Sequence, residues 1–184
     1  MAKGIPPAKA LMSDAPSTRT LFPKIYATLR SLAERRLRRE PAGQTLTPSD
    51  LVHEVYLRLL RDGSGTWESP SQFFYVAAEA ARRILVERAR WRLAVRHGGG
   101  LTRVPLDEWI EGIGPAEEVL ALDEGLALLE RHYPRKAQVV KLRYFAGFSV
   151  EETASLLGVS AGTVKLDWTF ARAWLRRTLK HGPD

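Results

Sequence analysis

The chain has 184 residues, of which 45% are hydrophobic and 27% are charged, so it can form a globular core and general disorder is excluded. Its 28 lysines and arginines exceed its 21 acidic residues, and the charge of +7 favours a polyanionic partner over a basic surface that serves solubility alone. Cysteine is absent, which excludes disulfides, cysteine-ligated metal centres and thiol catalysis. No apolar run approaches the roughly 18 residues of a membrane span, and the opening residues lack the apolar core of a secretory signal, so we expect a cytoplasmic protein.

The first half of the chain predicts three helices. Apolar residues recur at helical spacing over residues 21–40, which predicts the first helix. A second helix opens at Thr47 and Pro48, because a hydroxyl N-cap is followed there by proline and then by Asp50 in the first turn. A third helix starts at Ser69, three residues before a glutamine that completes a capping box, and its second half is rich in arginine. An acidic stretch with proline and glycine follows and predicts a linker.

Helical periodicity returns after this linker, and no segment alternates as a strand does. We therefore predict an all-α fold of two small helical domains joined by a flexible linker, the C-terminal one a helix-turn-helix. The predicted boundaries are residues 1–18 for a disordered tail, 19–97 for the first domain, 98–117 for the linker and 118–184 for the second domain.

The C-terminal motif covers residues 151–175. A capping box at residues 149–152 starts a short helix, Gly158 suits a left-handed turn, and Ser160 caps a longer helix. Such a second helix fits the major groove of DNA. The alternative is an αα-hairpin with a solvated basic side, but the glycine turn with both caps favours DNA binding. The face opposite the core is predicted to present Lys165, Thr169, Arg172 and Arg176.

Aromatic residues and arginines are mixed over residues 61–97. Aromatic rings stack on unpaired bases while arginines follow the backbone, so this segment fits single-stranded nucleic acid. The helical spacing of Phe73 and Phe74 favours a core position for these two rings. Trp67 lies in a Gly/Ser loop and is the preferred stacking candidate.

No catalytic constellation is present. His53 and Glu54 begin like a zinc-protease helix, but Leu57 stands where the second histidine is required. The other histidines lack ligand spacing, and the glycines at 98–100 lack the lysine of a phosphate loop. We therefore expect no enzyme activity, no metal and no cofactor.

Two motifs resemble those of extracytoplasmic-function (ECF) sigma factors. Residues 49–59 (SDLVHEVYLRL) are similar to one motif of that family, and residues 160–165 (SAGTVK) with 171–177 (ARAWLRR) are similar to its C-terminal helix-turn-helix. The order, the separation and the intervening linker also agree. The resemblance implies a sigma factor that directs core RNA polymerase to a subset of promoters and initiates DNA-templated transcription.

The resemblance further implies a role for each domain. The first, region two, would bind the polymerase clamp and the minus-ten element, and the second, region four, the minus-thirty-five element and the polymerase flap. An anti-sigma factor is a usual partner in the family. The implied polymerase-binding residues are Asp50, Leu51, His53, Glu54, Tyr56, Leu57 and Arg58. The minus-ten set is Trp67, Arg82, Arg83, Arg88, Arg90, Trp91 and Arg92. The minus-thirty-five set is Thr163, Lys165, Leu166, Asp167, Thr169, Arg172 and Arg176, in which Leu166 and Asp167 replace a commoner polar and basic pair.

Other functions remain open at this stage. A dimeric helix-turn-helix regulator would bind an operator without polymerase, whereas a non-specific RNA-binding protein would bind any single strand with strong salt dependence. A nucleic-acid enzyme has the least support because no site is present.

Overall fold

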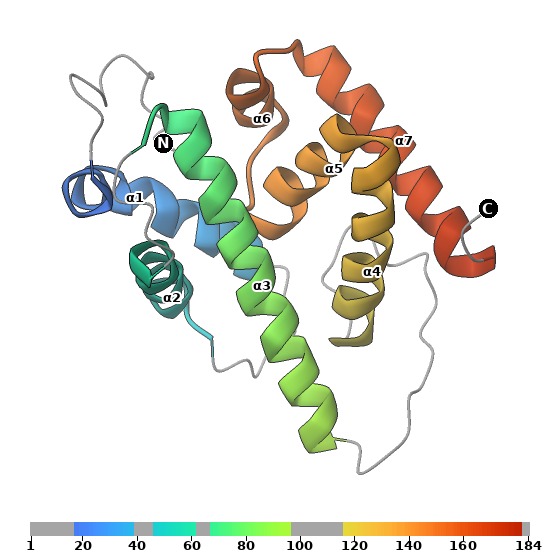
Figure 1. Ribbon diagram of the computed structural model, residues 1–184, viewed down its shortest axis with the longest axis horizontal. Helices are drawn as coiled ribbons and strands as arrows, with labels where there is room; N and C mark the ends of the chain where they lie inside the picture. The colour runs from blue at the N-terminus through green and yellow to red at the C-terminus, as the bar shows by residue number, and fades with distance from the viewer. Residues whose placement is uncertain (1–16, 39–45, 62–66, 97–115, 182–184) are drawn as a thin grey trace.

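A computed structural model describes residues 17–38, 46–61, 67–96 and 116–181, and these ranges form helices and no sheet (Figure 1). The all-α prediction is therefore confirmed for them, and none of their helices is long and apolar enough to cross a membrane. Most of the predicted tail and most of the predicted linker lie outside the described residues, so the domain boundaries stay a prediction. Thr18, which the predicted boundaries place in the tail, is buried and begins the first helix. The helices are α1 (Thr18–Leu37), α2 (Pro48–Arg61), α3 (Pro70–Arg96), α4 (Ala116–His132), α5 (Pro134–Val140), a π-helical turn η3 (Lys141–Phe145), α6 (Val150–Leu157) and α7 (Ala161–His181).

The predicted caps are present. At α2, the Thr47 hydroxyl accepts from the Asp50 N–H (3.2 Å), while the Thr47 N–H donates to the Asp50 carboxylate (3.0 Å). At α6, Ser149 and Glu152 form the reciprocal capping box. Gly158 ends α6 with φ +65, in the left-handed region. Each cap satisfies backbone groups that the first or last turn leaves unpaired.

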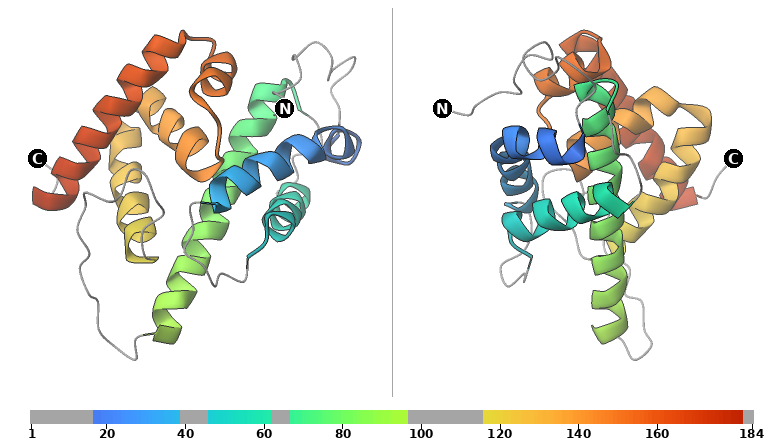
Figure 2. Two further views of the ribbon diagram at one scale, coloured as in Figure 1. Left: turned by 180° about the vertical axis from the view of Figure 1, so that it is seen from behind. Right: turned by 60° about the vertical axis from the view of Figure 1, so that its left-hand side comes forward.

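The two halves of the chain lie against each other. Helix α2 packs on α3 and also packs against α1, whereas α4 and η3 pack on α3 from the other half of the chain, so α3 runs between the two halves (Figures 1 and 2). One cluster of buried apolar residues extends from α1 through α3 and α4 into α7, and a smaller cluster lies under the helix-turn-helix. The predicted core positions Phe73 and Phe74 are 0% and 1% exposed, which confirms them.

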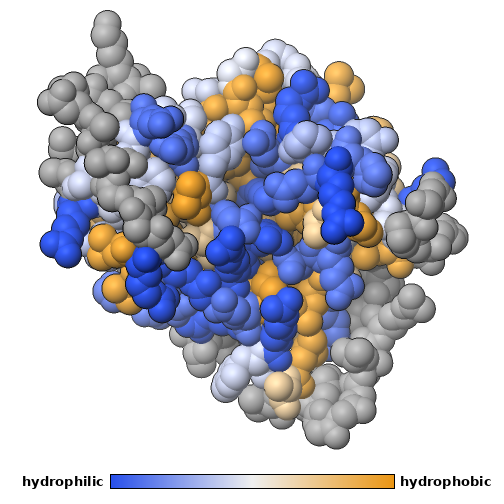
Figure 3. Space-filling model, in the orientation of Figure 1, coloured by the Kyte–Doolittle hydropathy of each residue, from blue (hydrophilic) through white to orange (hydrophobic). Residues whose placement is uncertain are grey.

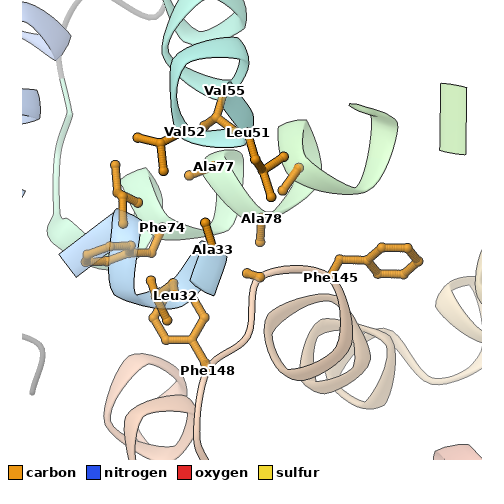
Figure 4. A pocket seen from close by; sticks show the side chains of 13 residues that line it. Leu32, Ala33, Leu51, Val52, Val55, Phe74, Ala77, Ala78, Phe145 and Phe148 are labelled. Carbon is orange, nitrogen blue, oxygen red and sulfur yellow. The ribbon is translucent and has the colours of Figure 1, made fainter. Parts of the chain in front are cut away.

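The segment between η3 and α6 forms an apolar contact between the halves. Phe148 is buried, and its ring centroid lies 5.5 Å from that of Phe74 on α3. Gly147 has φ +80, and a Cβ there would lie 2.6 Å from the carbonyl oxygen of Leu32. Figure 4 shows Phe148 beside Leu32 and Phe74. These three residues help to line an apolar cavity of about 40 Å³. The segment fits against α1 because residue 147 has no side chain.

Ion pairs also join the halves. Arg35 at the end of α1 makes two hydrogen bonds to the Glu152 carboxylate on α6, at 2.8 and 3.0 Å. Lys141 on η3 lies 3.2 Å from Glu79 on α3, and Arg82 pairs with Asp123 on α4. The apolar contact and these ion pairs together hold α3 against α4 and η3.

Candidate protein and nucleic-acid interfaces

The outward face of α2 carries one exposed stripe. Asp50, His53 and Leu57 are exposed at helical spacing, and 43% of Leu57 is accessible. The hydrogen bonds with Thr47 lower the pKa of the Asp50 carboxyl, so it is ionised at neutral pH. This stripe combines an acid, an imidazole and an exposed leucine on one rigid helix, which suits contact with another protein.

The remaining predicted polymerase-binding residues of α2 face the protein itself. Leu51 is 3% exposed and belongs to the core in this structure, and its assignment as a direct partner contact stays a prediction. Tyr56 is partly buried with its ring 4.2 Å from that of Phe22. Glu54 pairs with Arg88, and Arg58 pairs with Glu87, both on α3. Amphipathic spacing identified the helix, but long-range pairing with α3 decides which polar residues face outward.

Trp67 is 1% exposed, so the predicted open stacking platform at this residue is wrong. Its indole N–H donates to the Thr18 hydroxyl at 3.1 Å, and its ring meets Phe73 edge-on with centroids 5.1 Å apart. A buried indole needs such a partner for its N–H, and the start of α1 supplies it. Trp67 therefore connects α1 to the start of α3.

Trp91 is the exposed aromatic residue on the basic half of α3. It is 65% exposed, the largest value among the aromatic residues in the described ranges. Arg90 beside it is also exposed, and Arg92 is half-buried. The structure thus presents the aromatic and cationic groups expected for a nucleic-acid surface at Trp91 rather than at Trp67.

Carboxylates surround the other predicted cations of α3. Arg82 pairs with Glu79 (2.8 Å) and with Asp123, while Arg83 lies 3.3 Å from Glu79. Asp123 also lies 3.9 Å from Arg90. Burial would raise the pKa of Glu79, but hydrogen bonds and charges from Arg82 and Lys141 outweigh it and lower that pKa to about 2. The pairing is therefore fully ionised at neutral pH.

Helix α7 has one buried side and one exposed side. Its buried side contains Val164, Ala171 and Leu175, with Trp168 partly buried beside them. Of the predicted minus-thirty-five set, Lys165, Leu166 and Thr169 are exposed, and Thr163, Arg172 and Arg176 are half-buried.

Asp167 departs from this set because it is buried, at 3% exposure. Its carboxylate accepts from Arg135 at 2.7 and 3.2 Å and lies 3.4 Å from Lys136. The hydrogen bond from Arg135 is the main cause of the lowered pKa of Asp167. In this structure the side chain fixes α7 to the start of α5 and does not face outward, and its assignment to direct DNA contact stays a prediction. No local pattern reveals this pair, whose members are 32 residues apart.

The surface around these helices is largely hydrophilic, with separate small apolar patches (Figure 3). A helical protein with a capped helix-turn-helix, a basic aromatic helix end and an exposed amphipathic helix has the features of a transcription factor. The model of the ECF sigma factor family matches residues 11–181, so the chain belongs to this family. It is a sigma factor, which directs RNA polymerase in the initiation of transcription.

Several curated relatives agree with this family. The chain is 28% identical to "ECF RNA polymerase sigma factor ShbA" of Streptomyces griseus, over 86% of this chain and 85% of that protein. It is 30% identical to "RNA polymerase sigma-E factor" of Streptomyces coelicolor, over 84% of each. The sigma-E factor of Streptomyces antibioticus is also 30% identical, over 78% of each chain.

Proposed function

We propose that this sigma factor uses the outward face of α2 to bind the clamp of core RNA polymerase, α3 to bind the minus-ten element, and α7 to bind the minus-thirty-five element. It performs no chemistry of its own and works where the polymerase works, in the cytoplasm. The observation that supports this most directly is that α2 and α7 each expose several residues along one side of the helix. The chain also belongs to a family of proteins that act with RNA polymerase.

The polymerase contact centres on the stripe of Asp50, His53 and Leu57. An exposed leucine between polar neighbours on a rigid helix gives a partner an apolar anchor with a polar rim. Because Glu54 and Arg58 pair with α3, they support the helix rather than contact the partner.

The minus-ten contact centres on Trp91, with Arg83 and Arg90 exposed on the same helix. Stacking on an aromatic ring contributes roughly 1–3 kcal/mol per base, whereas opening duplex DNA costs about 1.4 kcal/mol per step. One exposed ring can hold a flipped base but not a whole bubble. Stable promoter opening therefore requires the polymerase, which also holds both DNA-binding helices in register.

Co-elution of the full chain with core RNA polymerase, with a primary sigma factor as competitor, tests this function. We expect a one-to-one complex that the competitor displaces. Leu57→Arg should weaken that complex by at least about ten-fold, because it places a charge at the apolar anchor. Leu166→Ala, which also changes an exposed leucine, should leave complex formation unchanged.

Two outcomes would contradict the proposal. Absence of a complex, together with a stable dimer that binds a discrete duplex tightly, would indicate an operator-binding regulator. A complex that Leu57→Arg leaves intact would remove the α2 face from the interface while retaining the family function.

A further inference from the structure

The outward face of α7 exposes two large apolar side chains, Leu166 and Phe170, and the ring of Phe170 packs edge-on against Tyr133 with centroids 4.8 Å apart. Gly162, Thr169 and Ala173 are exposed and short, and they lie on the same side of the helix as Leu166. Leu166 is 74% exposed, the highest value among the large apolar residues in the described ranges. Phe170 is 38% exposed, so Leu166 is the large apolar side chain that α7 exposes most.

Contacts on the opposite side of α7 fix the orientation in which Leu166 points outward. Val164 and Ala171 are fully buried, and Asp167 is bound to Arg135 and Lys136. The Ser160 hydroxyl accepts from the Thr163 N–H at 3.0 Å, which caps the first turn. These contacts bracket Leu166 on both sides along the helix, so α7 cannot rotate to bury it without breaking them.

A leucine side chain offers no hydrogen-bond donor or acceptor. In the major groove it leaves a polar base edge unsatisfied, but it makes a favourable contact with the one apolar group there, the C5 methyl of thymine. Lys165 is exposed next to it and suits a phosphate, which positions the helix without reading sequence.

We infer that Leu166 is a specificity-determining residue that reads a thymine methyl group in the upstream promoter element. The inference rests on the proposed contact of α7 with that element. It also explains why a large apolar residue is so exposed on a helix that is proposed to face DNA.

Replacement of thymine by deoxyuridine tests this, because it removes only the methyl group. The full chain in complex with core polymerase is first used to select upstream elements from randomised duplexes. Each thymine of the selected element is then replaced singly by deoxyuridine. We expect one position at which the wild-type complex loses about four-fold in affinity, the value of one buried methyl.

Variants assign that loss to Leu166. Leu166→Ala should bind the thymine and deoxyuridine duplexes equally at that position. Leu166→Gln should prefer adenine there, because a carboxamide pairs with the adenine edge. Lys165→Ala should weaken all duplexes and leave the thymine-to-deoxyuridine ratio unchanged.

The inference is overturned if no position of the selected element responds to deoxyuridine, or if Leu166→Ala keeps the four-fold response. In either case selection of an element by the complex still supports the proposed function. Failure of the polymerase complex to select any element would instead contradict the contact of α7 with DNA, and the inference with it.

Discussion

Helices α3 and α7 are both proposed to face promoter DNA, yet they present their charges differently. On α3, Arg82, Arg83 and Arg88 are paired with carboxylates from α2, α3 and α4. On α7, Lys165, Leu166 and Thr169 are exposed, and Leu166 is the most exposed large apolar residue in the described ranges. DNA that binds α3 as proposed would therefore compete with these carboxylates, whereas the residues proposed to face DNA on α7 are already exposed.

This difference indicates that the two helices depend on the polymerase in different ways. For α3, a partner that separates the halves of the chain would expose cations now facing α4. For α7, the partner needs only to supply position. The proposed minus-ten contact on α3 depends on an exposed Trp91 and a buried Trp67.

Trp67→Ala should destabilise the protein by about 3–5 kcal/mol, because it removes a fully buried indole. Trp91→Ala should change the free energy of unfolding by less than about 0.5 kcal/mol, because that ring is exposed. Urea denaturation measures both. Permanganate footprints of the polymerase complex measure promoter opening. When opening is normalised to the amount of folded protein, only Trp91→Ala should reduce it. Equal stability of the two variants would place Trp67 at the surface after all.

Gly147→Ala tests the contact that holds the halves together. It should cost at least about 2 kcal/mol, since the left-handed φ and the nearby Leu32 carbonyl both oppose a Cβ. Gly158→Ala is the matched control, because Gly158 is also left-handed but nothing lies within 4 Å of its added Cβ. It should cost about 1 kcal/mol by thermal unfolding. Equal costs would show that residue 147 does not lie against α1 in solution.

Asp123→Asn should raise the affinity of the free chain for single-stranded DNA several-fold, because Arg82 and Arg90 lose a competing carboxylate. The salt dependence should steepen by about 0.7 for each additional phosphate that the chain neutralises. Glu130→Gln makes the same charge change on α4 beside Lys141. If both variants bind alike, net charge alone explains the higher affinity and Asp123 does not mask α3.

Glu79→Gln should flatten the acid dependence of stability. The folded pKa of Glu79 is about 2 against an ordinary 4.5, so its contribution is present above pH 4.5 and is lost as the pH falls toward 2. Unfolding free energies measured across that window should fall less in the variant than in the wild type. Parallel curves would indicate that Glu79 is not held between Arg82 and Lys141.

The caps, the turn at Gly158 and the buried stripe of α7 could be predicted because they depend on residues within one or two turns. The burial of Trp67 could not, because its partner Thr18 is 49 residues away. The pairing of Asp167 with Arg135 depends likewise on how α5 meets α7. Packing between the halves also depends on the absence of a side chain at Gly147, whose role appears only when α1 lies against it.

The most direct test of the central claim is transcription in vitro by core polymerase with and without the full chain, with transcript 5′ ends mapped on DNA fragments that carry its target promoters. We predict discrete starts that appear only with the chain, that share an upstream and a downstream element, and that are lost with Leu57→Arg. Starts that do not depend on the chain, or that Leu57→Arg leaves unchanged, would contradict the account.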